Sequence, residues 1–166
     1  VTFQLGLGVH SAAITYPELA QRLGVEIGMR SKSSDVRKAV MELRSNKGMV
    51  LNESDQDTWS VGSFFTNPVV TKTLADSLPT AIARWKVDTG IKVSAAALVE
   101  HSGFSKGFGL NPRAQISTKH ALALTNRGDA RAEDIMELAH AIQAGVHKKF
   151  GILLDIEPQI VGTFNQ

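Results

Sequence analysis

Residues 61–70 read Val-Gly-Ser-Phe-Phe-Thr-Asn-Pro-Val-Val, and this segment decides how the rest of the chain is interpreted. A glycine directly before Ser63 lets the backbone come close to a ligand, because glycine has no Cβ. The two phenylalanines that follow can shield the serine hydroxyl from water. The segment therefore favours a serine that acts as a proton donor or ligand in a dry pocket. A serine that caps a glycine turn is the alternative.

The composition indicates one globular domain, or one domain with a fragment of another. The chain has 166 residues, 43% of them hydrophobic, which suffices for a core of ordinary size. A net charge of +2 is too small to indicate nucleic acid binding. The absence of cysteine excludes disulfides and thiolate metal sites, and no apolar run is long enough to span a membrane. We therefore expect a cytoplasmic protein with no nucleic acid, membrane or metal partner.

Apolar residues recur at helical spacing in several segments, and capping signals mark where those helices begin. The predicted helices cover residues 16–23, 33–47, 67–78, 94–103 and 131–150. Asn67, Ser94 and Asp129 are the expected N-caps of the last three. Gly151 is expected to end the longest helix at its C′ position. The polar residues 51–60 are expected to form an exposed loop.

Short strands are expected at residues 1–8, 121–125 and 160–161, where β-branched or alternating apolar residues occur. Helices and short strands without regular βαβ alternation indicate the α+β class, with helices packed on a small mixed sheet. The strand at residues 1–8 is interpreted as the last strand of a preceding domain.

Three segments together resemble the UDP-N-acetylenolpyruvoylglucosamine reductase family in both order and spacing. Residues 61–70 resemble its serine signature, and residues 119–126 (KHALALTN) resemble its KHALxLxN strand. Residues 150–162 resemble its C-terminal FGxxLxxE segment and close in Val-Gly. The resemblance implies that residues 33–166 form the C-terminal substrate-binding domain. Residues 1–32 would be the trailing edge of the FAD-binding domain, with residue 47 as the alternative boundary.

The resemblance also implies a reaction. The family reduces the enolpyruvyl ether of UDP-N-acetylglucosamine enolpyruvate to UDP-N-acetylmuramate in peptidoglycan precursor synthesis. NADPH reduces FAD, and the flavin carries out the hydride chemistry. The family's FAD-binding segments and its catalytic arginine have no counterpart in this sequence. We therefore expect the chain alone to fold, to bind neither FAD nor NADPH, and to be inactive without its N-terminal FAD-binding domain.

Five site residues follow from the resemblance. Ser63 matches the general acid, and Glu157 matches the C-terminal glutamate near the substrate carboxylate and enolate. Asn67 matches a contact of the substrate diphosphate, and Arg44 and Lys47 match the basic pair on that diphosphate. Structural alternatives exist for each: a turn serine, an exposed glutamate, a pure N-cap, and cations favoured at a helix C-terminus.

Other interpretations stay open. The chain could be a non-catalytic sugar-nucleotide-binding module of the same fold, or an α+β interaction domain with no ligand. Lys119 and His120 are interpreted as a surface pair, with a substrate-facing role as the alternative. The glycine-containing segment 103–109 lacks the strand-loop-helix context of a phosphate loop.

Overall fold

The structure is a computed structural model that describes residues 2–4 and 6–162. The chain divides into two compact units, Val1–Val50 and Leu51–Gln166. The domain boundary expected from the sequence, at residue 32 or 47, stays a prediction. The assignment of the first unit to an FAD-binding domain stays a prediction.

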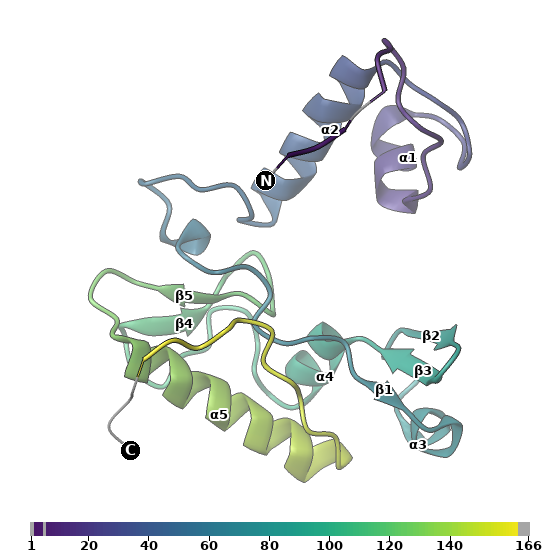
Figure 1. Ribbon diagram of the computed structural model, residues 1–166. Helices are drawn as coiled ribbons and strands as arrows, with labels where there is room; N and C mark the ends of the chain where they lie inside the picture. The colour runs from purple at the N-terminus through teal and green to yellow at the C-terminus, as the bar shows by residue number, and fades with distance from the viewer. Residues whose placement is uncertain (1, 5, 163–166) are drawn as a thin grey trace. The chain divides into compact units, whose positions relative to one another are not determined.

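The first unit is built on helices α1 (Pro17–Leu23) and α2 (Ser33–Asn46), which pack against each other (Figure 1). Both helices were predicted. Proline suits the first position of α1, because the N–H that proline lacks would have no partner within the helix there. Gly24 ends the helix in the left-handed region, at a φ of 67°. An ion pair between Arg22 and Glu42 links the two helices.

The predicted strand at residues 1–8 is wrong for the part that the structure describes. Residues 2–4 and 6–8 form no strand, and their side chains are exposed. Val1 and Leu5 of the predicted alternation lie outside the described residues. A strand requires a neighbour that accepts and donates its backbone hydrogen bonds, and the first pairing along the chain is an isolated bridge between His10 and Lys32.

The second unit has the α+β architecture that the sequence predicts. Its elements in chain order are a 3-10 turn (Gln56–Thr58), β1 (Val69–Val70), α3 (Lys72–Ser77), β2 (Arg84–Val87), β3 (Gly90–Val93), α4 (Ala95–His101), β4 (Ala114–Ile116), β5 (Leu124–Asn126) and α5 (Ala132–Phe150). The described strands form two antiparallel sheets, in the orders β1-β3-β2 and β4-β5, instead of one mixed sheet. The two sheets lie at separate places in the unit (Figure 1).

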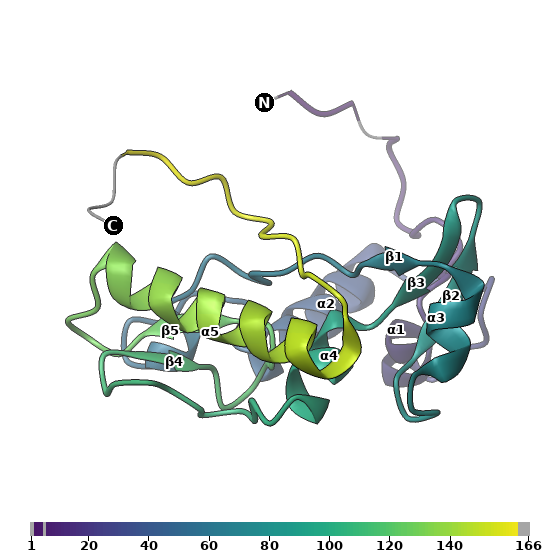
Figure 2. The same ribbon diagram turned by 90° about the horizontal axis from the view of Figure 1, so that it is seen from below.

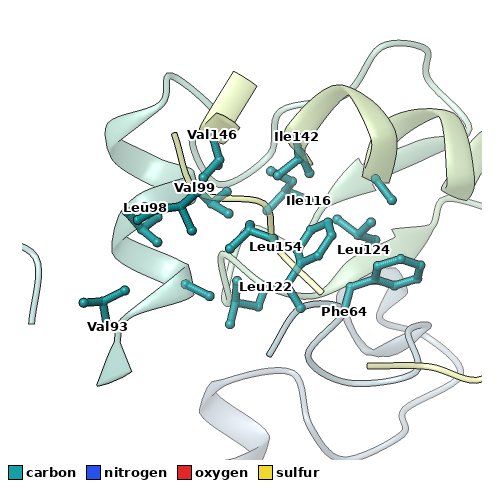
Figure 3. Close-up of a cluster of buried hydrophobic side chains, with 14 of the residues drawn as sticks. Phe64, Val93, Leu98, Val99, Ile116, Leu122, Leu124, Ile142, Val146 and Leu154 are labelled. Atoms are coloured by element: carbon teal, nitrogen blue, oxygen red, sulfur yellow. The ribbon is translucent and has the colours of Figure 1, made fainter. Parts of the chain in front are cut away.

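The core of the second unit lies where α5 packs against α4 and against β4 and β5. Leu138, Ile142 and Val146 recur every fourth residue on one face of α5, and each is at most 1% exposed. Figure 3 shows Ile142 and Val146 beside Ile116 and Val99 in the cluster that also holds Leu154 and Leu124. Burying an aliphatic side chain of this size contributes about 1.5–3 kcal/mol, so this face fixes α5 on the unit.

Side-chain hydrogen bonds mark where α4 and α5 begin. The Ser94 hydroxyl oxygen accepts from the Ala97 N–H at 3.2 Å, which confirms the predicted cap of α4. The longest helix, α5, runs from Ala132 to Phe150, and Gly151 follows it with a φ of 68°, which confirms the predicted C-terminal glycine. Its N-cap is Arg131 instead of Asp129, and the side chain of Asp134 accepts the Arg131 N–H at 2.8 Å.

Two further predictions about the second unit are wrong. The helix expected at 67–78 begins at Lys72, with Thr71 as its N-cap. Val69 and Val70 instead pair with β3, because β-branched residues suit a strand. Residues 160–161 form no strand. The strand expected at 121–125 is Leu124–Asn126.

Among the described residues, no helix combines the length and the apolar character that crossing a bilayer requires.

Candidate functional site

The candidate site is built around Ser63, which follows a glycine in the left-handed region. Gly62 has a φ of 88°, a conformation that favours glycine. The Phe64 N–H donates to the Leu122 carbonyl at 2.8 Å, and Ser63 itself forms an isolated antiparallel bridge with Ala123. Ser63 is half-buried in this arrangement. Backbone pairing with residues 122–123 therefore fixes the position of the serine backbone.

A second segment pairs with the other side of the same stretch. After α5 the chain turns back along the helix, as Figures 1 and 2 both show. The Glu157 N–H donates to the Phe64 carbonyl at 3.0 Å, and the Thr66 N–H donates to the Asp155 carbonyl at 3.0 Å. Ser63 and Glu157 therefore lie on directly paired backbone segments. The side chain of Glu157 is exposed.

Asn67 plays a part in the fold that the sequence did not indicate. No helix begins at Asn67. Its Oδ1 instead accepts the N–H of Ala95, the first residue of α4, at 2.9 Å. The partner lies 28 residues further along the chain. The Nδ2 group of Asn67 has no hydrogen-bond partner among the described residues, so it is available as a donor to a ligand.

The two predicted basic residues lie in the first unit. Lys47 directly follows α2, and its ammonium pairs with Glu18 at 2.5 Å. Arg44 lies in the last turn of α2 and is exposed. The structure thus brings together Ser63 and Glu157 in the second unit, with Asn67 shortly after Ser63 in sequence, whereas Arg44 and Lys47 belong to the other unit.

A buried ionic cluster around Asp57 escaped the sequence analysis. Residues 51–60 were expected to be an exposed loop, but Asp57 and Thr58 are each only 7% exposed. Asp57 accepts hydrogen bonds from Thr118 and from the guanidinium of Arg127. Burial raises the pKa of Asp57, but the Thr118 hydrogen bonds and the Arg127 charge outweigh it and hold the pKa below its usual value.

Lys119 and His120 contact protein groups in this structure. The Lys119 ammonium pairs with Asp55, and this hydrogen-bonded contact lowers the pKa of Asp55 and raises that of Lys119. The His120 Nδ1 accepts the Leu122 N–H at 3.1 Å. Both side chains therefore support the turn that leads to Leu122.

An open, largely apolar cavity borders the two candidate segments. Its volume is about 670 Å³, within the range of small-molecule sites. Val61 and Phe64 line it from the serine segment, and Pro158 lines it from the segment that follows Glu157. Neither Ser63 nor Glu157 lines it, so a ligand there would contact the neighbouring residues of both segments and not these two side chains.

Among the described residues, no Gly-x-Gly-x-x-Gly loop joins a strand to a helix, the unit that commonly holds a dinucleotide pyrophosphate. The one glycine-rich loop, residues 103–109, lies between α4 and β4, and no strand leads into it. A Cβ on Gly109 would lie 2.7 Å from the Ala114 carbonyl oxygen, so packing within the chain accounts for that glycine. Among these residues there is also no cluster of histidine, aspartate and glutamate that would hold a metal ion.

Comparisons with known proteins agree with the resemblance. A family model described as "UDP-N-acetylenolpyruvoylglucosamine reductase, C-terminal domain" matches residues 53–161, which lie within the second unit. The UDP-N-acetylenolpyruvoylglucosamine reductase of Mycolicibacterium gilvum is 49% identical and that of Mycobacterium sp. (strain MCS) is 50% identical. Each alignment covers 98% of this chain and 48% of the relative. The chain therefore spans about half the length of these curated relatives.

A solved structure of the reductase from Thermus caldophilus is a more distant match. It is 22% identical, with a TM-score of 0.43, over 79% of this chain and 37% of that chain.

Proposed function

This chain belongs to the family of UDP-N-acetylenolpyruvoylglucosamine reductase C-terminal domains, and we propose that it is the substrate-binding, proton-donating part of such a reductase. The observation that carries this proposal is the backbone hydrogen bond between Glu157 and Phe64, which joins the segments of Ser63 and Glu157. The reaction proposed for the whole protein is reduction of the enolpyruvyl ether of UDP-N-acetylglucosamine enolpyruvate. Its product serves peptidoglycan precursor synthesis.

In this proposal Ser63 supplies the proton. Reduction of the vinyl group leaves a carbon whose negative charge is delocalised into the neighbouring carboxylate, and that carbon must then be protonated. A serine hydroxyl is a weak acid, but it suffices beside so basic a carbon when water is excluded. Gly62 supports this role, because it brings the backbone close to a ligand without a Cβ.

Glu157 is proposed to act beside the substrate carboxylate and the enolate. A carboxyl group placed there can hydrogen-bond the developing enolate oxygen and the substrate carboxylate. Its exposed position leaves the side chain accessible to a ligand.

The diphosphate is proposed to contact three further residues. The Nδ2 group of Asn67, which has no hydrogen-bond partner among the described residues, suits a phosphate oxygen. Arg44 and Lys47 carry the positive charge that a diphosphate favours, and their contact with it stays a prediction. The surface pair of Lys47 with Glu18 is a weak competitor, because exposed ion pairs contribute about 0–1 kcal/mol.

FAD and NADPH belong to the proposal for the whole protein and not to this chain. We assign no step of the hydride transfer to the described residues. We expect the 166-residue chain to show no flavin binding and no NADPH-dependent reduction. The partner that completes the site would be an N-terminal FAD-binding domain. A cytoplasmic location stays a prediction.

An NMR titration of the chain with UDP-N-acetylglucosamine enolpyruvate tests the proposal. Amide shifts that cluster at Ser63, Asn67 and Glu157 are expected even at weak affinity. In the complete gene product, Ser63→Ala should lower kcat about a hundredfold or more, the scale of general acid catalysis. Ser77→Ala, at an exposed serine near the end of α3, is the matched control. Unchanged turnover in Ser63→Ala would refute the role of proton donor.

A further inference from the structure

Asp57 connects the 3-10 turn to residues far along the chain. Its Oδ1 accepts the Thr118 N–H at 2.8 Å, and its Oδ2 accepts the Thr118 hydroxyl. The Nη2 of Arg127 donates to the same Oδ1 at 2.7 Å. The Arg127 Nε is buried and has no hydrogen-bond partner in the part of the chain that the structure describes. Loss of the Asp57 carboxylate would therefore leave a guanidinium that is mostly buried and poorly compensated.

The turn that Asp57 holds ends at the pairing partners of the serine segment. Residues 117–123 close into a turn through backbone hydrogen bonds. At its end, the Leu122 carbonyl accepts the Phe64 N–H at 2.8 Å, and Ala123 bridges Ser63. The position of the turn therefore sets the position of the serine backbone.

The 117–123 turn joins β4 to β5, which form a hairpin, and two further contacts attach residues 56–64 to the β5 end of that hairpin. The Gln56 side-chain amide donates to the Arg127 carbonyl at 2.7 Å. The Asn126 N–H donates to the Trp59 carbonyl at 2.9 Å. Together with the hydrogen bond between Phe64 and Leu122, these contacts attach both ends of residues 56–64 to the hairpin of β4 and β5. The segment therefore has little freedom to shift.

We propose that Asp57 is a positioning residue for Ser63, acting through the 117–123 turn, an inference that rests on the proposed role of Ser63 as proton donor. Asp57 itself is buried, so it acts through Thr118 and not on the substrate. Geometry of this kind matters because a displacement of about 1 Å at a reacting group can lower the rate about a hundredfold.

Kinetics of the complete gene product test the inference. Asp57→Asn and Thr118→Val should each lower kcat about tenfold or more while KM changes less than about twofold, because the proton donor is displaced and substrate contacts remain. Thr118→Ser keeps the hydroxyl and should retain the rate. Thr118 is exposed, so Thr118→Val tests the same contact even if Asp57→Asn does not fold.

Asp134→Asn is the matched control, because Asp134 is also a buried carboxylate paired with an arginine, Arg113, but outside the 117–123 turn. It should lower stability without lowering kcat at a temperature where the protein is folded. An equal loss of kcat in Asp134→Asn, or normal turnover in both Asp57→Asn and Thr118→Val, would overturn the inference.

Hydrogen exchange of the 166-residue chain separates this inference from the proposed function. In Thr118→Val the Phe64 amide should exchange about tenfold faster. The exchange rate of the Leu98 amide, which donates to the carbonyl of Ser94 at the start of α4, should not change. Unchanged exchange at Phe64 overturns the positioning role whatever Ser63→Ala does. If the Phe64 amide exchanges faster but Ser63→Ala keeps full activity, Ser63 is not the proton donor. The inference is then overturned because its premise fails, and only the structural contact between Asp57 and the turn remains.

Discussion

The side-chain oxygen of Asn67 accepts the first amide of α4, from Ala95, at 2.9 Å. A residue expected to contact a diphosphate thus also satisfies a helix N-terminus of the fold. The two roles use different atoms of one side chain, since Oδ1 binds the helix and Nδ2 has no partner among the described residues. They can therefore be separated by substitution.

We expect Asn67→Ala to lower both stability and substrate affinity, because it removes both atoms. The lost cap should cost about 1 kcal/mol in the free energy of unfolding. Asn67→Asp keeps the acceptor and adds a charge that a helix N-terminus tolerates, so stability should be retained. The same charge repels a diphosphate, so affinity should still fall. Urea unfolding and calorimetric titration with the UDP sugar measure the two effects. Normal affinity of Asn67→Asp would show that Nδ2 does not contact phosphate.

Asp134 should make stability sensitive to acid. The Arg131 N–H, more than the Arg113 charge, holds the pKa of Asp134 below its ordinary value of 3.8, against the opposing effect of burial. A carboxyl with a lower pKa in the folded state stabilises the fold fully above the unfolded value. That contribution is lost as pH falls from about 4 through the folded pKa.

Urea unfolding at pH 7 and pH 3 measures this contribution. We expect Asp134→Asn to be destabilised at pH 7 and to lose less stability than the parent chain between the two pH values. Asp129→Asn, at an exposed site near the start of α5, should behave as the parent chain does. Identical acid sensitivity of the parent chain and Asp134→Asn would contradict the prediction.

Gly145 is expected to be required inside α5 for packing. A Cβ at this position would lie 2.3 Å from the Phe104 ring, which itself packs edge-on against Phe108. Alanine favours a helix over glycine by about 1 kcal/mol, but overpacking costs about 1–3 kcal/mol. Gly145→Ala should therefore destabilise the chain, and thermal unfolding should show a lower melting temperature.

The same substitution in a Phe104→Leu background isolates the cause. With the ring removed, alanine should stabilise α5 relative to glycine, so the sign of the effect should reverse. A destabilisation of equal size in both backgrounds would show that the ring is not responsible.

Local signals in the sequence were sufficient to place α1, α2, α4 and α5, although they misplaced the start of α3 and the N-cap of α5. Proline at the start of α1, Ser94 before α4 and Gly151 after α5 all act within one helical turn, and all were predicted correctly. The apolar periodicity of α5 likewise needs only its own residues. The α+β class followed from the order of such elements.

Contacts between distant segments were not predictable in this way. Asp57 reads as one polar residue in a polar loop, because its partners Thr118 and Arg127 lie 61 and 70 residues away. The hairpin of β2 and β3 was also missed, although Asp88-Thr89-Gly90 between two short segments that contain β-branched or aromatic residues is a turn signal. Asn67 looked like a local cap for the same reason that Asp57 looked exposed: the partner is remote.

The pairing of Phe64 with Glu157 also bears on how the chain folds. Most of the second unit lies between these two residues, so joining them closes a long loop, and long-range closure is slow compared with helix formation. The helices and hairpins can form from local contacts before the C-terminal segment docks. We therefore expect Ser63 and Glu157 to reach their mutual arrangement late in folding, after the helices of the domain have formed.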